Sequence, residues 1–188
     1  IEQNELTYDH ILVRFGELST KGKNRKDFIK RLLTNVKNAL RDFNELTYER
    51  THDRMYIMLN GEDHEAVAKH LQQVFGISSF SFAVKVASDI KVIKQTCLVL
   101  AKQSDAQTFK IEARRSFKQF PMVSDEINRE VAGEILRNTD IKVNVREPQL
   151  RIQIELHQEA TYIMTGKIKG NGGYPVGVGG KALVMLSG

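Results

Sequence analysis

Residues 11–43, ILVRFGELSTKGKNRKDFIKRLLTNVKNALRDF, decide the fold of the first part of the chain, because the spacing of their apolar residues changes abruptly. Over 11–15 the apolar residues Ile11, Val13 and Phe15 fall on one side of an extended chain, as in a strand whose two faces differ in burial. Over 28–43 the apolar residues recur every three to four positions, which predicts a helix with one apolar stripe. Asn24 is its expected N-cap. The fold therefore opens with a strand followed by a helix.

Further elements follow up to residue 86. Alternation and turn residues predict extended segments at 45–50 and 55–59, a turn at Asn60-Gly61, a helix from Asp63 to Gly76 and a strand over 77–86. The resulting order is β-α-β-β-α-β, which is the ferredoxin-like order. We assign residues 1–76 to an N-terminal ferredoxin-like domain.

A second α/β module is expected over residues 77–167. It contains a helix capped by Ser88, a strand over 108–113, a basic loop, and a helix capped by Ser124. Alternating apolar residues then predict strands over 141–145, 150–156 and about 162–164.

The end of the sequence changes composition. Seven of the 15 residues from 166 to 180 are glycine, and so many glycines make a helix or strand interior entropically costly. We expect a linker or a loop that approaches another backbone closely. The apolar run 182–186 is typical of a strand buried in a parallel sheet. Residues 168–188 are therefore assigned to a linker and the first strand of a further domain.

Composition limits the classes of function. The 188 residues carry a net charge of +5, which favours a polyanionic partner. No apolar run reaches the ~20 residues of a membrane-spanning helix, so we expect a cytoplasmic protein that does not enter a membrane. A single cysteine, Cys97, excludes an internal disulfide, and no two histidines have helical metal-ligand spacing. We expect no metal site and no catalytic group in this chain.

The first basic group surrounds the start of the first helix. Between Arg14 and Arg41 there are nine basic and two acidic residues, and the loop Lys21-Gly22-Lys23-Asn24-Arg25 lets the backbone approach an anion. We predict phosphate contacts from four residues: Lys21, Lys23, Arg25 and Lys26. The alternative is a solvated helix face.

A second basic group is interleaved with Phe109, Phe117 and Phe120. Its members are Lys110, Arg114, Arg115 and Lys118. Such side chains bind phosphate, and exposed aromatic rings can stack on unpaired bases. The alternative is that the phenylalanines belong to the core and the basic residues surround it, which we accept for Phe109.

The sequence resembles one family along nearly its whole length. The segments Arg14-Phe15-Gly16-Glu17, Lys21-Gly22, Asn24-Arg25 and Phe28 are similar to the N-terminal signature of the bacterial tRNA 4-thiouridine synthetases, also called tRNA sulfurtransferases or ThiI proteins. Thr51-His52-Asp53-Arg54-Met55 resembles a further segment of that domain. Residues 114–118, with Phe120-Pro121 and Ser124, resemble the THUMP domain of the family, and residues 166–188 resemble the linker and opening strand of its PP-loop domain.

The resemblance implies a function. In this family the ferredoxin-like and THUMP domains bind tRNA, and the PP-loop domain uses ATP and magnesium to adenylate the uridine at position 8. Sulfur from a persulfide, supplied by a cysteine desulfurase, then displaces AMP, and the same proteins are linked to thiazole sulfur in thiamine biosynthesis. The residues that would begin the ATP site are Met185, Leu186, Ser187 and Gly188.

The resulting prediction is the tRNA-binding half of a tRNA sulfurtransferase. The sequence stops at Gly188, before most of the ATP site of the family, so we expect this chain to be inactive alone. One alternative is a THUMP-type RNA-binding module of another RNA-modifying enzyme, such as a methyltransferase, with no sulfur chemistry. Another is a protein-interaction module. Whether the chain forms a homodimer is left open.

Overall fold

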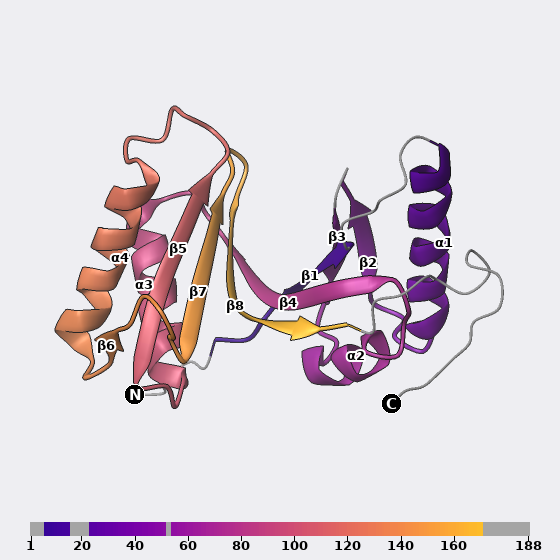
Figure 1. Ribbon diagram of the computed structural model, residues 1–188, viewed down its shortest axis with the longest axis horizontal. Coiled ribbons are helices and arrows are strands. Elements are labelled where there is room, and N and C mark those ends of the chain that lie inside the picture. The colour runs from indigo at the N-terminus through magenta and orange to yellow at the C-terminus, as the bar shows by residue number, and fades with distance from the viewer. Residues whose placement is uncertain (1–5, 16–22, 52–53, 171–188) are drawn as a thin grey trace. The chain divides into compact units, whose positions relative to one another are not determined.

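The computed structural model describes residues 6–15, 23–51 and 54–170. By its internal contacts the chain divides into two compact units (Figure 1). The first unit contains His10–Ser81 and the segment from Lys167 onward, and the second contains the segment up to Asp9 and Phe82–Gly166. The strand β4 (Ile77–Val86) runs from the first unit into the second.

The first unit has the predicted order β-α-β-β-α-β. Its elements are β1 (His10–Phe15), α1 (Lys23–Ala39), β2 (Thr47–Arg50), β3 (Arg54–Met58), α2 (His64–Leu71) and the first part of β4. The strands lie in the order β2-β3-β1-β4, and β3 pairs antiparallel with both β1 and β2. This arrangement confirms the ferredoxin-like prediction.

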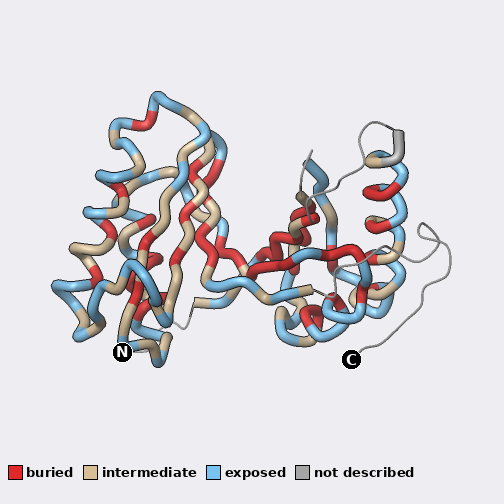
Figure 2. The backbone as a smooth tube through the Cα atoms, viewed as in Figure 1, coloured by how far each residue is buried: buried red, intermediate tan, exposed pale blue. Residues whose placement is uncertain are grey.

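The apolar stripe of α1 is buried as predicted. Phe28, Leu32 and Val36 are no more than 4% exposed, and the strand residues Ile11 and Val13 are fully buried. Figure 2 shows buried and exposed positions alternating along α1, as expected of a helix with one side in the core. The opposite side of the helix is exposed within the described part of the chain.

The ends of the helices differ from the predictions in detail. Helix α2 starts next to Asp63, close to the predicted start, and Asp63 caps it because its carboxylate accepts a hydrogen bond from Ala66 N at 3.3 Å. However, α2 ends at Leu71 rather than at Gly76, whose φ of +100° instead marks the turn into β4. Helix α1 begins at Lys23, so Asn24 lies in its first turn and not before it.

The second unit consists of strands with two helices packed against them. After β4 it contains α3 (Ile90–Gln103), β5 (Thr108–Arg115), α4 (Ser124–Asn138), β6 (Lys142–Val143), β7 (Leu150–Leu156) and β8 (Thr161–Lys169). Its strands lie in the order β8-β7-β5-β6, with β5 parallel to both neighbours and β7 antiparallel to β8. Helices α3 and α4 lie on the same side of these strands (Figure 1) and share one core with them.

Two predicted caps of the second unit are wrong. Asp89, not Ser88, caps α3 by accepting hydrogen bonds from Lys91 N and Val92 N. The Ser88 hydroxyl instead bonds the Thr161 hydroxyl at 2.8 Å, a contact that no local pattern indicates. Ser124 is already the first residue of α4, whose start is supported by the Glu126 carboxylate accepting from Val123 N.

The strand predicted over 141–145 is shorter than expected. Only Lys142 and Val143 form β6, because the Asn144 side chain accepts hydrogen bonds from the N–H groups of Arg146 and Glu147 and turns the chain. The strand predicted over 150–156 is confirmed as β7.

A linker or a close-approach loop was predicted from residue 166 onward. The linker is wrong for residues 166–169, and the close approach to another backbone is confirmed at Gly170. Strand β8 continues through Gly166, which has a φ of +69°, to Lys169. Gly170 does approach another backbone: its N–H donates to Ser78 O at 3.0 Å, and a Cβ there would lie 2.3 Å from Ile77 O. Residues 171–188, including the apolar run 182–186, lie outside the described residues.

Gly170→Ala should destabilise the first unit by about 1–3 kcal/mol, because the new methyl group collides with the backbone of Ile77. Amide hydrogen exchange measures this, since it reports each unit separately. The control is Gly133→Ala in α4, where a Cβ meets only the flexible end of Arg137 and should stabilise the helix by up to ~1 kcal/mol. Unchanged exchange in the first unit of Gly170→Ala would contradict the close approach.

Candidate nucleic-acid interface

The first basic group is only partly described. Lys21 lies outside the described residues, and Lys23 begins α1 but its side chain is not described. Arg25 is half-buried and Lys26 is exposed on the first turns of the helix. Lys26 makes no ion pair within the described parts of the chain.

Further cations continue along the outer side of α1. At 100° per residue, Lys30 and Lys37 lie within roughly 40° of Lys26 around the helix axis. All three are exposed, and Lys37 Nζ lies 5.5 Å from the centre of the Tyr48 ring. The helix therefore presents a row of ammonium groups over several turns, on the side away from its apolar stripe.

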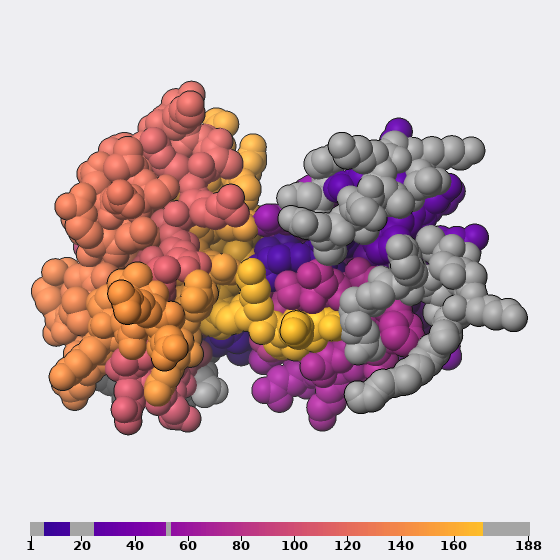
Figure 3. All heavy atoms as spheres, viewed as in Figure 1, coloured from indigo at the N-terminus to yellow at the C-terminus, as the bar shows by residue number. Residues whose placement is uncertain are grey.

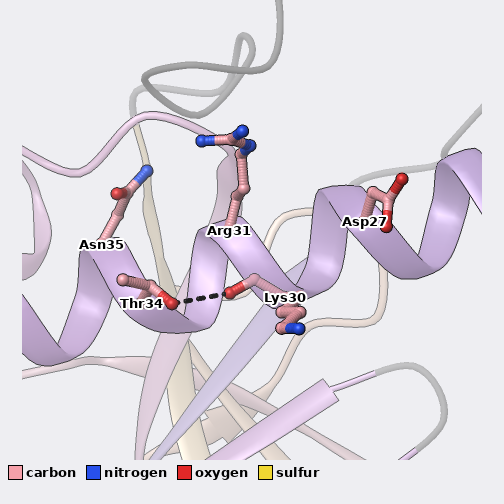
Figure 4. Close-up of a pocket in the computed structure, with 5 residues that line it drawn as sticks. All are labelled: Asp27, Lys30, Arg31, Thr34 and Asn35. Carbon is pink, nitrogen blue, oxygen red and sulfur yellow. Dashed lines mark hydrogen bonds between the residues drawn. The ribbon is translucent and has the colours of Figure 1, made fainter.

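A shallow hollow of about 410 Å³ lies against this helix. Its described lining consists of Asp27, Lys30, Arg31, Thr34 and Asn35 (Figure 4). Arg31 and Asn35 extend from one side of the helix and Lys30 from the other, and the Thr34 hydroxyl donates to Lys30 O at 3.0 Å. The lining thus combines two cations with the carboxylate of Asp27, and Lys30 points away from Arg31, so the hollow by itself does not select an anionic ligand.

Not every basic residue of the first group is available. Arg14 is half-buried in the sheet, where its Nη1 donates to Ser81 Oγ at 2.9 Å and lies 3.4 Å from Ser79 Oγ. This arginine joins β1 to β4, so its role is structural.

In the second group, Lys110 is paired with a carboxylate. Its Nζ lies 3.1 Å from Glu112 Oε1, and Glu112 also accepts from Arg151 and from Gln153. Burial raises the pKa of the Glu112 carboxyl, but the bonds from Lys110 and Gln153 and the charges of Arg151 and Lys110 bring that pKa below its ordinary value. The charge of Lys110 is therefore balanced within the protein.

Arg115 holds the loop that follows β5. It is half-buried, and its Nη1 donates to Lys118 O and to Phe120 O, both at 3.2 Å. Arg114 and Lys118, in contrast, are exposed and form no ion pair with a described residue. The structure thus separates one loop-forming arginine from two cations that face solvent.

The phenylalanines of this group belong to the interior. Phe109 is fully buried, as predicted, and Phe120 is 7% exposed, which favours the core alternative for Phe120 over base stacking. Phe117 is half-buried and packs edge-on against Phe120, with ring centres 6.0 Å apart. The packing of Phe117 and Phe120 therefore joins the basic loop to the core of the unit.

Two residues that the sequence did not single out also anchor this loop. Ser116 N donates to Leu156 O at 2.9 Å, and the Ser116 hydroxyl lies 2.8 Å from His157 Nδ1. His157 Nε2 lies 3.8 Å from Glu155 Oε2. Because Ser116 and His157 are 41 positions apart, no local signal could have paired them.

Other chemistry is limited in the described residues. Across 6–15, 23–51 and 54–170, no three His, Cys, Asp or Glu side chains are placed to hold a metal ion. Cys97 is fully buried, and burial raises the pKa of its thiol far above the ordinary value, so this cysteine packs in the core as a small apolar side chain. His52, Asp53 and the four residues 185–188 predicted for ATP lie outside the described residues. No described helix is long and apolar enough to cross a membrane.

Comparison with known proteins identifies two domains. Residues 10–81 match the ThiI ferredoxin-like domain, and residues 87–165 match the THUMP domain. The chain is 51% identical over 183 residues to a probable tRNA sulfurtransferase of Bacillus licheniformis and 50% identical over 186 residues to that of Bacillus subtilis. These alignments cover 96% and 97% of this chain but 46% of each relative, so the chain spans about half their length.

A solved structure is similar over the same range. It is a complex of a 4-thiouridine synthetase with RNA and bound ATP, 31% identical in sequence, with a TM-score of 0.82. The alignment covers 96% of this chain and 47% of that one. The agreement in fold extends over both units.

The ion cluster around Glu112 should make the stability of the second unit depend on pH. Because the pKa of Glu112 is lowered in the folded state, its contribution is present at neutral pH and is lost as the pH falls through the lowered value. Glu112→Gln should therefore cost about 1 kcal/mol at neutral pH and much less in acid. Urea unfolding at both pH values measures the difference. The exposed Glu159→Gln is the control, and an equal effect of both variants would contradict the assignment.

Proposed function

Because the chain belongs to the tRNA sulfurtransferase family through its ThiI ferredoxin-like and THUMP domains, we propose that it is the tRNA-binding part of an enzyme that makes 4-thiouridine at position 8 of tRNA. The observation that carries the proposal is that each of these two domains has exposed cations that form no ion pair with a described residue. Lys26 and Lys30 belong to the first unit, and Arg114 and Lys118 to the second. Cations without carboxylate partners favour phosphate.

The ThiI ferredoxin-like match over residues 10–81 favours this function over a THUMP-bearing methyltransferase. Reading the gene beyond Gly188 tests the choice. A continuing Gly-x-Asp-Ser motif supports the sulfurtransferase, and a stop codon or a methyltransferase domain contradicts it.

The residues are proposed to act in two ways. Lys21, Lys23, Arg25 and Lys26 near the start of α1, together with Arg114 and Lys118 in the second unit, would contact phosphates directly. Arg115 acts as a positioning residue, because its guanidinium is engaged with two loop carbonyls. Lys110 contributes less, since its charge is balanced by Glu112.

The chemistry of the whole protein lies beyond the described residues. We propose that the complete enzyme uses ATP and magnesium to adenylate the oxygen at C4 of the uridine, and that persulfide sulfur from a cysteine desulfurase then displaces AMP. A role in thiamine sulfur supply and a cytoplasmic location belong to the same proposal. We propose that the part of this chain in that reaction is to bind tRNA.

Replacing Arg114 or Lys118 with glutamine should weaken tRNA binding and reduce the salt slope of log K by roughly one for each phosphate that is no longer neutralised. Lys110→Gln should have a smaller effect because that lysine is already paired. Filter binding over a salt series measures the slopes. The control is Lys91→Gln, an exposed lysine of α3, and a slope in Arg114→Gln no different from that of the control rejects a phosphate contact by Arg114.

The row on α1 makes a separate prediction for the first unit. The double variant Lys26→Gln/Lys30→Gln should lower tRNA affinity at low salt and reduce the slope by about two. Lys69→Gln on α2 is the matched control from the same unit, because Lys69 is also exposed. An equal decrease in affinity in the control would mean that only overall charge matters, and the row would then have no specific role.

A further inference from the structure

Contacts of one serine join the basic loop, residues 114–118, to the end of β7. Ser116 N donates to Leu156 O at 2.9 Å, and the Ser116 hydroxyl lies 3.3 Å from the same oxygen. That hydroxyl also lies 2.8 Å from His157 Nδ1. In Figure 3 the basic loop, salmon, and the turn between β7 and β8, orange, both reach the surface at the upper end of the second unit. A bond at the surface competes with water, so it holds the loop only if its partner is itself fixed.

The turn that carries His157 is fixed by bonds that do not involve the basic loop. His157 N donates to Ala160 O at 3.0 Å, and the Ser88 hydroxyl donates to His157 O at 2.5 Å. The imidazole ring packs edge-on against the Tyr162 ring, with centres 6.1 Å apart. His157 is therefore a fixed point against which the loop is held.

The other ring nitrogen of His157 shows in which direction the bond to Ser116 runs. His157 Nε2 is buried and has no hydrogen-bond partner among the described residues, and Glu155 Oε2 lies 3.8 Å from it. A carboxylate repels a nitrogen lone pair and attracts an N–H, so the hydrogen of the neutral ring lies on Nε2. Nδ1 is then an acceptor, and the Ser116 hydroxyl donates to it.

We infer that His157 is a positioning residue for RNA binding, an inference that rests on the function proposed above. The Arg115 guanidinium closes the basic loop on itself through two loop carbonyls, whereas Ser116 joins the loop to β7 and to His157. The exposed Arg114 and Lys118 each lie two positions from Ser116. Holding Ser116 fixes the place of both cations before RNA binds, which lowers the entropy lost on binding.

Amide hydrogen exchange of the free chain tests the tie without RNA. His157→Gln places its amide near the position of Nε2 and removes the acceptor at Nδ1, so the Ser116 amide should exchange about tenfold faster. His157→Asn places an oxygen near the position of Nδ1 and should keep the exchange of the wild type. The control is Gln158→Ala, because Gln158 is an exposed residue of the same turn.

Two results of the exchange experiment would overturn the inference. One is unchanged exchange at Ser116 in His157→Gln. The other is faster exchange throughout β7 in that variant, because this would mean that His157 stabilises the whole unit and does not position the loop.

Filter binding of tRNA tests the consequence for RNA. His157→Gln should weaken binding roughly three- to tenfold, and His157→Asn should restore it to within about twofold of the wild type. The salt slope should stay the same in both variants, because neither changes the number of phosphates that the cations neutralise. Wild-type affinity in His157→Gln, equal weakening by both variants, or a reduced slope would overturn the inference.

The two experiments separate this inference from the proposed function. A wild-type chain that binds no tRNA would contradict the proposed function and, with it, a role of His157 in RNA binding. Exchange at Ser116 decides independently whether His157 holds the loop. A wild-type chain that binds tRNA, with weaker binding in Arg114→Gln but not in His157→Gln, would support the proposed function and overturn the inference alone.

Discussion

The parallel pairing of β5 with β7 determines which side chains of the second unit reach solvent. Phe109 pairs with Leu150, and the register continues to Arg115 opposite Leu156. Alternate residues of both strands enter the core, so Lys110, Glu112 and Arg114 must lie on the other face. Arg115 falls on the core side at the end of β5, where its guanidinium bonds loop carbonyls. One register therefore assigns different roles to two adjacent arginines.

The same constraint explains why charge alone is a poor guide to the interface. Of the basic residues in the two groups, Arg14 is used within a sheet, Arg115 within a loop, and Lys110 within an ion pair. Two cations that form no ion pair with a described residue lie elsewhere. Lys30 lies on the outer side of a helix, and Lys118 lies in the loop after a strand. Their availability is a consequence of packing.

Sequence patterns predicted the elements whose signals are local. The stripe of α1, the alternation of β7 and the start of α2 next to Asp63 are each encoded within a few residues. The errors arise where distant parts decide: Ser88 bonds Thr161 instead of capping α3, and β8 passes through Gly166. Within the site, period-two alternation could have placed Arg115 with Phe109, but only the β5–β7 register brings Arg151 to Glu112. The Ser116–His157 contact likewise had no sequence signal.

The central claim is that the exposed cations of these two units, which form no ion pair within the described part of the chain, recognise a folded nucleic acid and do not merely respond to charge. The most direct measurement is a competition between tRNA and an unstructured polyphosphate of equal charge for this chain, repeated over a series of salt concentrations. The account predicts that tRNA binds more tightly at every salt concentration and that the preference persists when the electrostatic contribution is reduced. Equal affinities for the two polyanions would contradict it.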